Sequence, residues 1–312
     1  MVIWIKKKKR WKVQMTFSKL SKLVLALGAT AALAACGNGG STDESTDSNS
    51  TTEATAITGP ISVISREEGS GTRDAFVEAT GVMADDVDHT TAAATIMNGT
   101  DQVMTAVADD PNAIGYISLG SLNDTVTAVS VDGVEPTEEN VASGDYAISR
   151  PFNIVYQGEL EGVVADFHDF IFSEEGQAIV SEEGYVQAKA DAEPYAGDGA
   201  QSGSITVVGS TSVSPVMEKL AEAYQDVNSG VQVNVTSNGS SAGVKAAADG
   251  TADLGMASRA LADDETDVTA EAIATDGVAV IVNPENGITD LSLDTIAGIF
   301  TGETTDWEGT AQ

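Results

Sequence analysis

Cysteine is nearly absent from this 312-residue sequence, which has only Cys36. An internal disulfide is therefore excluded, because it needs two cysteines. Histidine is almost as scarce, with His89 and His168 alone. These three residues are too few for a typical zinc or other transition-metal site. The string G-x-x-x-x-G-K-[ST] is missing too, so the chain lacks the phosphate loop of a nucleotide hydrolase. We expect no metal and no cofactor.

Basic residues are scarce in the part of the chain that follows Cys36. All 48 Asp and Glu residues lie there against seven Lys and Arg residues, which leaves a net charge of −41. Nucleic acid binding needs a basic surface and is excluded by this balance. The few arginines therefore indicate where an anion could bind, because Arg66, Arg73 and Arg259 lie in strings rich in Gly and Ser.

An apolar run long enough to span a bilayer is also missing. The main run near the N-terminus, residues 23–32, is well short of the roughly 20 residues that a membrane-spanning helix needs. It follows eight Lys and Arg residues and precedes small residues, a pattern typical of a secretory signal. We therefore assign residues 1–36 to a signal peptide that starts at either Met1 or Met15.

The end of this signal carries a second pattern. Residues 33–37 read Leu-Ala-Ala-Cys-Gly and resemble a bacterial lipobox, in which the cysteine is lipidated and becomes the mature N-terminus. We expect a lipid anchor on Cys36. Residues 37–56 are rich in Ser, Thr, Asp and Glu with almost no large apolar side chain, so they predict a disordered tether. Residues 57–312 remain for the folded part.

Strand and helix patterns alternate through residues 57–312. This alternation is typical of an α/β fold with largely parallel sheets. One helix is expected to begin at Ser214, which would be its N-cap. Its apolar stripe would be Val216, Leu220, Tyr224 and Val227. The expected strands are 61–65, 113–118, 126–131, 152–156, 205–208, 231–235, 252–256 and 278–282, and the other expected helices are 71–80, 101–109, 160–172, 175–181, 242–249 and 293–300.

Four strings of glycine and hydroxyl residues follow expected strands. In the first, residues 65–73, Gly69 and Gly71 allow close approach of the backbone to a ligand. The start of a helix favours an anion there, and Arg66 can add a bidentate guanidinium. Because ligands of open α/β sheets lie at the carboxyl ends of strands, we expect these strings to share one site for a small tetrahedral oxyanion. The other strings are residues 209–215, 238–243 and 255–259.

One of these strings also fits a different class of protein. Residues 239–243 match G-x-S-x-G, the nucleophile elbow of serine hydrolases. That motif expects a histidine later in the chain, and both histidines lie earlier. A surface hydrolase therefore stays a minor alternative, and we assign no catalytic residue.

Together these strings resemble the phosphate-binding protein of bacterial phosphate ABC transporters, a type II periplasmic-binding-protein-like family. The most specific match is residues 63–73, Val-Ile-Ser-Arg-Glu-Glu-Gly-Ser-Gly-Thr-Arg. The resemblance covers essentially all of residues 57–312. Further matching strings are residues 112–116, 173–177, 209–215, 238–245, 252–259, 276–284, 296–302 and 305–307.

The resemblance implies an α/β fold of two lobes, joined by two crossover hinge strands near 150–155 and 278–282. In the usual order of the family, the string at 209–215 opens the domain, whereas here the second half comes first. We interpret the chain as circularly permuted, with residues 196–203 joining the old termini. A truncated tandem array is the alternative. Lobe II would combine 57–149 with 282–312, and lobe I would be 150–281.

The resemblance also implies which residues bind phosphate. Many members of the family have Asp where Ser258 stands, and that carboxylate accepts the proton of phosphate and rejects sulfate. Ser258 is also an acceptor, so it offers a less secure means of discrimination. Glu68 is implied to orient an arginine, and Arg73 and Arg259 are possible supporting residues. The implied phosphate ligands are Arg66, Ser70, Gly71, Thr72, Thr211, Ser212, Ser240 and Ser258.

The expected protein is a lipid-anchored, monomeric solute-binding protein on the extracytoplasmic face of a Gram-positive type of cell membrane. It would capture inorganic phosphate by lobe closure and pass it to the membrane subunits of an ABC importer, with no enzymatic activity. A binding protein for sulfate or molybdate is the alternative within the same class. An adhesion or sensing lipoprotein without a transport role also stays open.

Overall fold

The computed structural model describes residues 57–308 and 310. The expected signal peptide, the expected lipidation site Cys36 and the expected tether therefore lie outside the described residues. Within the described ranges, no helix is both long and apolar enough to cross a membrane.

All eight expected strands are present, and several are longer than their apolar patterns. The expected strand 278–282 is only the end of a strand that begins at Thr269, because its first part is partly exposed and mixes polar with apolar residues. Residues 83–88 form a separate two-stranded hairpin. The strands are β1 Ser62–Arg66, β2 Met83–Ala84, β3 Val87–Asp88, β4 Thr95–Met97, β5 Ala113–Ser118, β6 Thr127–Val131, β7 Ser149–Tyr156, β8 Val186–Gln187, β9 Ser202–Gly209, β10 Gly230–Ser237, β11 Leu254–Ala257, β12 Thr269–Val282 and β13 Asp290–Leu291.

The helices begin at hydroxyl caps in several places. The Oγ of Ser70 accepts a hydrogen bond from the amide of Arg73 at 3.4 Å, which caps an orphan amide of the first turn. The expected cap Ser214 instead lies inside its helix, because its amide already donates to the Ser210 carbonyl. Val227, expected in the apolar stripe of that helix, is 47% exposed at its end. The helices are α1 Gly71–Thr80, α2 Thr100–Ala108, η1 Leu119–Ser121, α3 Glu138–Ser143, α4 Gly162–Ile171, α5 Glu174–Glu182, α6 Ser214–Val227, α7 Ser240–Ala248 and α8 Leu293–Thr301.

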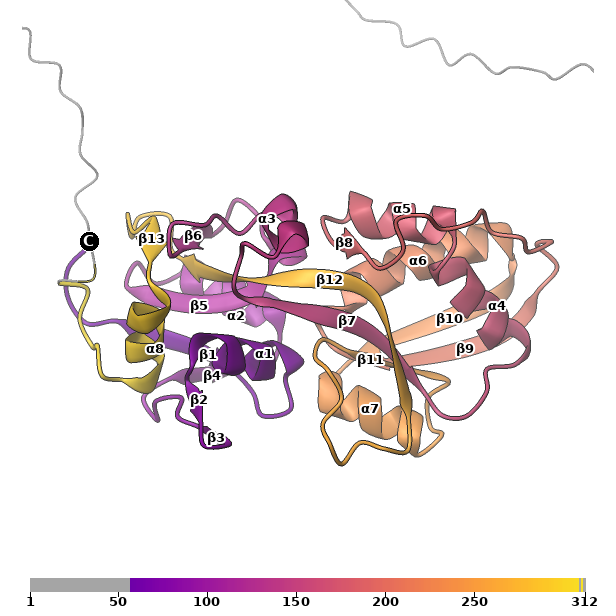
Figure 1. The fold of residues 1–312 in the computed structure, drawn as a ribbon, viewed down its shortest axis with the longest axis horizontal. Helices are drawn as coiled ribbons and strands as arrows, with labels where there is room; N and C mark the ends of the chain where they lie inside the picture. Colours follow the sequence, from indigo (N-terminus) through magenta and orange to yellow (C-terminus); the bar gives the residue numbers. More distant parts are fainter. Residues whose placement is uncertain (1–56, 309, 311–312) are drawn as a thin grey trace, which may run out of the picture. The chain divides into compact units, whose positions relative to one another are not determined.

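A mixed sheet runs through the described residues in the order β10-β9-β11-β7-β12-β5-β1-β4 (Figure 1). At one end β10, β9 and β11 are parallel, and at the other end β5, β1 and β4 are parallel. The long strands β7 and β12 pair antiparallel with each other and with a neighbour on either side. The chain therefore has a mixed α/β fold in which two parallel groups of strands share two connecting strands.

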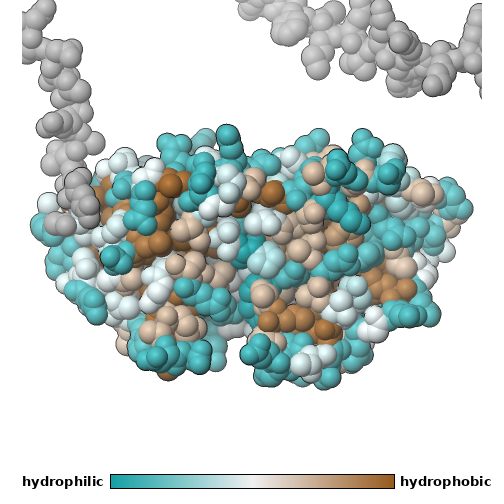
Figure 2. Space-filling view, viewed as in Figure 1, coloured by the Kyte–Doolittle hydropathy of each residue, from teal (hydrophilic) through white to brown (hydrophobic). Residues whose placement is uncertain are grey.

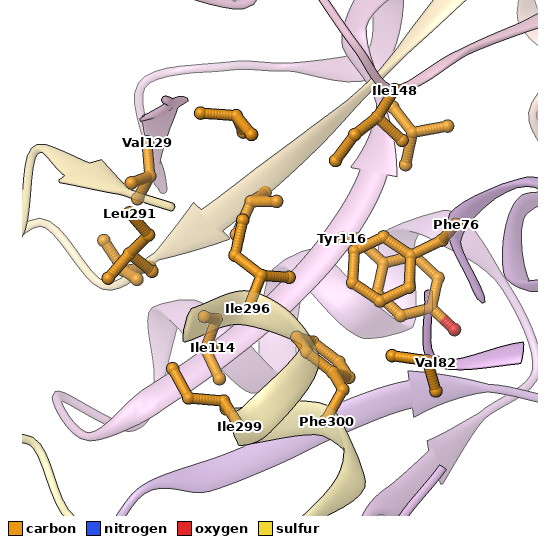
Figure 3. Packing of buried hydrophobic residues seen from close by; sticks show 14 of the residues in the cluster. Phe76, Val82, Ile114, Tyr116, Val129, Ile148, Leu291, Ile296, Ile299 and Phe300 are labelled. Carbon is orange, nitrogen blue, oxygen red and sulfur yellow. The ribbon is translucent and has the colours of Figure 1, made fainter. Parts of the chain in front are cut away.

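The buried side chains form separate cores for the two groups. One large cluster packs α1, α8 and β5 around Phe76, Tyr116 and Phe300, whose rings lie close together (Figure 3). The other large cluster lies among α4, α6 and β9. We keep the name lobe II for the part with the first cluster and lobe I for the part with the second.

The connecting strands pass between these cores within a few residues. Ile148, just before β7, belongs to the lobe II core, whereas Phe152 of β7 belongs to the lobe I core. Along β12 the passage lies between Ala274 and Val278, a few residues before the boundary of 281 and 282 that we expected. Both strands run side by side across the middle of Figure 1. These two paired strands are therefore where the sheet passes from one core to the other.

Candidate functional site

Arg66 stands at the end of β1 with its side chain fully enclosed. The residue is 1% exposed, and its amide donates to the hydroxyl of Tyr116 at 3.2 Å. Tyr116 stacks on Phe76 (Figure 3). Their ring centroids are 3.9 Å apart. Burial raises the pKa of Tyr116 to about 12, so this hydroxyl stays protonated at neutral pH. The aromatic core thus fixes the position of the Arg66 backbone.

The guanidinium of Arg66 reaches both lobes. Its Nη1 lies 3.4 Å from Oγ1 of Thr72 in α1, and its Nη2 donates to Oγ1 of Thr211 in lobe I at 3.0 Å. Its Nε and Nη2 also donate to the carboxylate of Glu67, each at 2.8 Å. A buried charge needs such partners to offset its desolvation.

The start of α1 lies directly against hydroxyls of lobe I. A Cβ on Gly71 would stand 2.6 Å from the Oγ of Ser240 and 2.9 Å from the Oγ of Ser258. The carbonyl of Gly69 accepts the amide of Ser241 at 3.1 Å. Only glycine allows so close an approach at residue 71, so the start of α1 packs directly against the hydroxyls of lobe I.

Lobe I contributes hydroxyls from the ends of three parallel strands. Ser210 follows β9, Ser240 follows β10 and Ser258 follows β11. Oγ of Ser210 donates to Oγ of Ser258 at 2.9 Å, and Oγ of Ser240 lies 3.2 Å from that same atom. Ser212 crosses to lobe II, where its Oγ lies 2.9 Å from Oγ1 of Thr72. Parallel strands end at one edge of the sheet, which explains why strings far apart in sequence meet here.

The expected ligand residues are therefore neighbours in space. Seven of them are buried and Thr211 is partly buried. Arg66 contacts Thr72 and Thr211, and Thr72 contacts Ser212. Gly71 lies against Ser240 and Ser258, which are also neighbours of each other. Ser70 caps α1 between these two groups. Their role in binding phosphate stays a prediction.

The expected supporting residues fare differently. Glu68 is exposed, and the acid that binds Arg66 is Glu67, so the expectation for Glu68 was wrong by one residue. The carbonyl of Glu67 accepts the amide of Ser70, and this turn folds Glu67 toward the guanidinium. Arg73 binds Asp88 at 2.7 Å and the Arg66 carbonyl at 2.9 Å, so it braces the turn from outside.

Arg259 bridges the lobes without facing the hydroxyl cluster. It donates to both carboxylate oxygens of Glu265 at 2.7 Å and lies 3.1 Å from Asp74 of lobe II. The hydrogen bonds that Arg259 donates to Glu265 raise the pKa of Arg259, so the guanidinium stays charged. Burial raises the pKa of Asp74, which Arg259 opposes. With two carboxylates already bound, Arg259 is placed to hold the lobes together rather than to neutralise an anion.

Two features of the site were missed at the level of sequence. Thr100, the first residue of α2, lies within 3.5 Å of the hydroxyls of Thr211 and Ser212. Arg150 of β7 pairs with Asp276 of β12 at 2.9 Å, where the connecting strands pass between the lobes. The string Asn98-Gly99-Thr100 before a helix resembles the other four strings and could have been found. No local pattern joins residues 150 and 276.

Most groups of this cluster can donate hydrogen bonds. It holds one guanidinium, several hydroxyls and the amides at a helix start, all of which donate. Across residues 57–308 and 310, no group of three or more His, Cys, Asp and Glu could hold a metal ion. The space-filling view is hollowed along its lower edge, between the lobe with the β2-β3 hairpin and the lobe with α7 (Figure 2).

Comparison with known proteins gives consistent matches. A family model described as a PBP superfamily domain matches residues 27–175 and 194–311. The "Phosphate-binding protein PstS 2" of Streptococcus pneumoniae is 44% identical over 94% of this chain and 99% of its own length. A crystal structure of a phosphate ABC transporter's phosphate-binding protein from the same species has a TM-score of 0.67 and 46% identity, and covers 81% of this chain and 100% of that chain. The "Phosphate-binding protein PstS" of Bacillus subtilis is 36% identical over 40% of this chain and 41% of its own length.

Proposed function

Because this chain belongs to the PBP superfamily and, within it, to the phosphate-binding protein family, we propose that it captures inorganic phosphate between its lobes and delivers it to an ABC importer. The relatives that match it over nearly their whole length are binding proteins, and solute-binding proteins are not enzymes. The lipid anchor on Cys36 and the monomeric state belong to the same proposal.

One observation carries this proposal. The buried guanidinium of Arg66 is surrounded by hydroxyls from both lobes, with Thr72 on one side and Thr211 on the other. A tetrahedral anion has oxygens pointing in four directions, so donors on opposite walls can bind it simultaneously. Closure is then favoured by phosphate, because the anion contacts all donors only in the closed state.

The strongly negative charge of the protein does not prevent this binding. Charges farther away than about 8 Å are largely screened at physiological ionic strength. At short range the anion meets a guanidinium, hydroxyl donors and the positive end of the α1 dipole. Local donors should therefore decide the affinity, and added salt should change it little.

The direct test is calorimetric titration of the protein, without residues 1–36, by phosphate, sulfate and molybdate. We expect phosphate to bind with a Kd of about 1 μM or tighter, since buried charge-assisted hydrogen bonds contribute strongly. A protein that binds none of the three anions would contradict the proposal. Tighter binding of sulfate or molybdate would reassign the site to that anion, and this comparison matters because Ser258 offers no carboxylate.

The ion pair of Arg259 and Asp74 gives a second prediction. We expect Arg259→Gln to weaken phosphate binding only about fivefold, because partly exposed ion pairs contribute about 1 kcal/mol. The loss should appear as faster dissociation in stopped-flow measurements, since the pair holds the closed state. Lys245→Gln, which removes the same charge from an exposed pair on α7, should have no effect. If Arg259→Gln abolished binding, Arg259 would be a ligand instead.

The hydrolase alternative receives no support from the geometry. Ser241, the central serine of the G-x-S-x-G match, accepts a hydrogen bond from Arg259 at 3.2 Å. In the described part of the chain, neither His89 nor His168 is hydrogen-bonded to it. His168 lies in α4 and is hydrogen-bonded to Glu271 of β12.

We further propose that the chain is a circular permutant of the more usual family order. The two described ends lie side by side, since the amide of Trp307 donates to the Gly59 carbonyl at 2.9 Å and Pro60 bridges Asp306. Ends so close can be joined with little strain. In the usual family order these ends would be joined, and the chain would instead begin and end near residues 196–203. If the two halves of the sequence stand in opposite order in two proteins, an alignment that keeps the chain order can match only one half. The match to the Bacillus subtilis relative, which covers 40% of this chain, is consistent with that. The pneumococcal relative matches throughout and shares the order of this chain.

A further inference from the structure

Thr100 lies in the same hydroxyl cluster as the expected ligand residues but comes from a different helix. It is the first residue of α2 and is only 5% exposed. Its Oγ1 lies 3.5 Å from Oγ1 of Thr211 and 3.4 Å from Oγ of Ser212. The preceding Gly99 approaches the same wall, because a Cβ there would lie 4.0 Å from a methyl group of Thr211.

These distances leave the Thr100 hydroxyl without a strong partner. Good O–H···O hydrogen bonds span about 2.5–3.0 Å, and both contacts of Thr100 are longer. Its neighbours have shorter contacts elsewhere, Thr211 with Arg66 at 3.0 Å and Ser212 with Thr72 at 2.9 Å. A buried hydroxyl that is this weakly bonded has donor capacity for a further acceptor.

The surroundings indicate where that acceptor would lie. A cavity of about 390 Å³ adjoins Thr100, with Ser121 on the lobe II side and Thr211 and Ser214 on the lobe I side. The Oγ of Ser121 is buried and has no hydrogen-bond partner among the described residues. The N-terminus of α2 also directs its dipole toward this wall. Hydroxyls of both lobes therefore line this cavity beside the carboxylates of Asp101 and Glu218, and Thr211 connects it with the Arg66 cluster.

We propose that Thr100 is a further ligand of the bound anion, with its hydroxyl donating to a phosphate oxygen. This inference rests on the proposed function. It adds the start of α2 to the lobe II elements that contact the anion, beside Arg66 at the end of β1 and the start of α1. Because Thr211 and Ser212 both neighbour Thr100, the proposed contact lies at the boundary of the lobes.

The test compares Thr100→Val with Thr100→Ser by phosphate calorimetry and thermal unfolding. Valine keeps the shape and removes the donor, so we expect phosphate to bind about tenfold to a hundredfold more weakly, the loss of a hydrogen bond to a charged group. Serine keeps the donor and should bind within about threefold of the wild type. Both unliganded variants should unfold near the wild-type temperature, which a purely structural role of the hydroxyl would not allow.

Thr105→Val is the matched control on the same helix. Thr105 is exposed, and its hydroxyl donates to the Asp101 carbonyl, so its loss should leave the affinity unchanged. Wild-type affinity in Thr100→Val, or an equal loss in Thr105→Val, would overturn the role of Thr100. Failure of the wild type itself to bind any of the oxyanions would instead refute the proposed function, so the two failures are distinguishable.

Discussion

Replacing Arg66 with methionine should weaken phosphate binding by about thirtyfold to several thousandfold. Removal of one member of a buried, hydrogen-bonded charge pair costs about 2–5 kcal/mol, and each 1.4 kcal/mol is a factor of ten. Arg66 is the enclosed cation of the cluster, and its Nη2 already reaches Thr211 across the lobes. Calorimetry with phosphate measures the change directly.

Part of this loss should come from the neighbouring carboxylate. Without the guanidinium, Glu67 has no cation to offset its charge and repels the anion. The double variant Arg66→Met with Glu67→Gln should therefore recover some affinity over Arg66→Met, but remain well below the wild type. The difference between the two variants separates repulsion from the lost direct contact.

Arg73→Met is the control for net charge. Arg73 lies seven residues away in the same string and binds Asp88 on the outside of the turn. We expect an effect within about threefold. Equal losses in Arg66→Met and Arg73→Met would mean that only overall charge matters, and an unchanged affinity in Arg66→Met would remove Arg66 from the site.

Breaking the ion pair between the connecting strands should have the largest effect on stability. Asp276→Asn is expected to lower the free energy of unfolding by about 3–5 kcal/mol, because it leaves the Arg150 guanidinium buried without a counterion. The two side chains are 1% and 0% exposed, and Ser118 also donates to Asp276 at 2.9 Å. Urea unfolding followed by the fluorescence of Trp307, the only tryptophan after Cys36, measures the loss.

Replacing both members of the pair should lower the free energy of unfolding less than replacing Asp276 alone. Burial raises the pKa of Asp276 in spite of Arg150, so desolvation outweighs the attraction between them. We therefore expect the double variant Arg150→Met with Asp276→Leu to be more stable than Asp276→Asn. Asp249→Asn, in an exposed pair with Lys245, should cost at most about 0.5 kcal/mol. If Asp276→Asn lowered the free energy of unfolding as little as Asp249→Asn, the ion pair of Arg150 and Asp276 would not stabilise the connecting strands.

The sequence was a good guide to the local elements and to the composition of the site. The expected helices 71–80 and 293–300 agree with α1 and α8 to within one residue. Strings of glycine and hydroxyl residues at strand ends predicted a common site, and the structure brings Ser240 and Ser258 together as expected. Such predictions work because periodicity, capping and the shared edge of parallel strands are properties of short segments.

Tertiary structure decided the partners. Glu67 rather than Glu68 binds Arg66 because of how one turn folds, and Arg259 binds acids of both lobes instead of joining the hydroxyls. Arg150 and Asp276 are 126 residues apart and meet only because two long strands pair.

The sequence by itself therefore determined the longer strands and helices and most of the donors at the strand ends, but not α3 or the short strands β2, β3, β4, β8 and β13. Only the packing of the two lobes decided which donors face each other and which charges are neutralised. The physical reason is range: conformational preferences act over a few residues, whereas hydrogen bonds and buried ion pairs depend on distances that the whole fold sets.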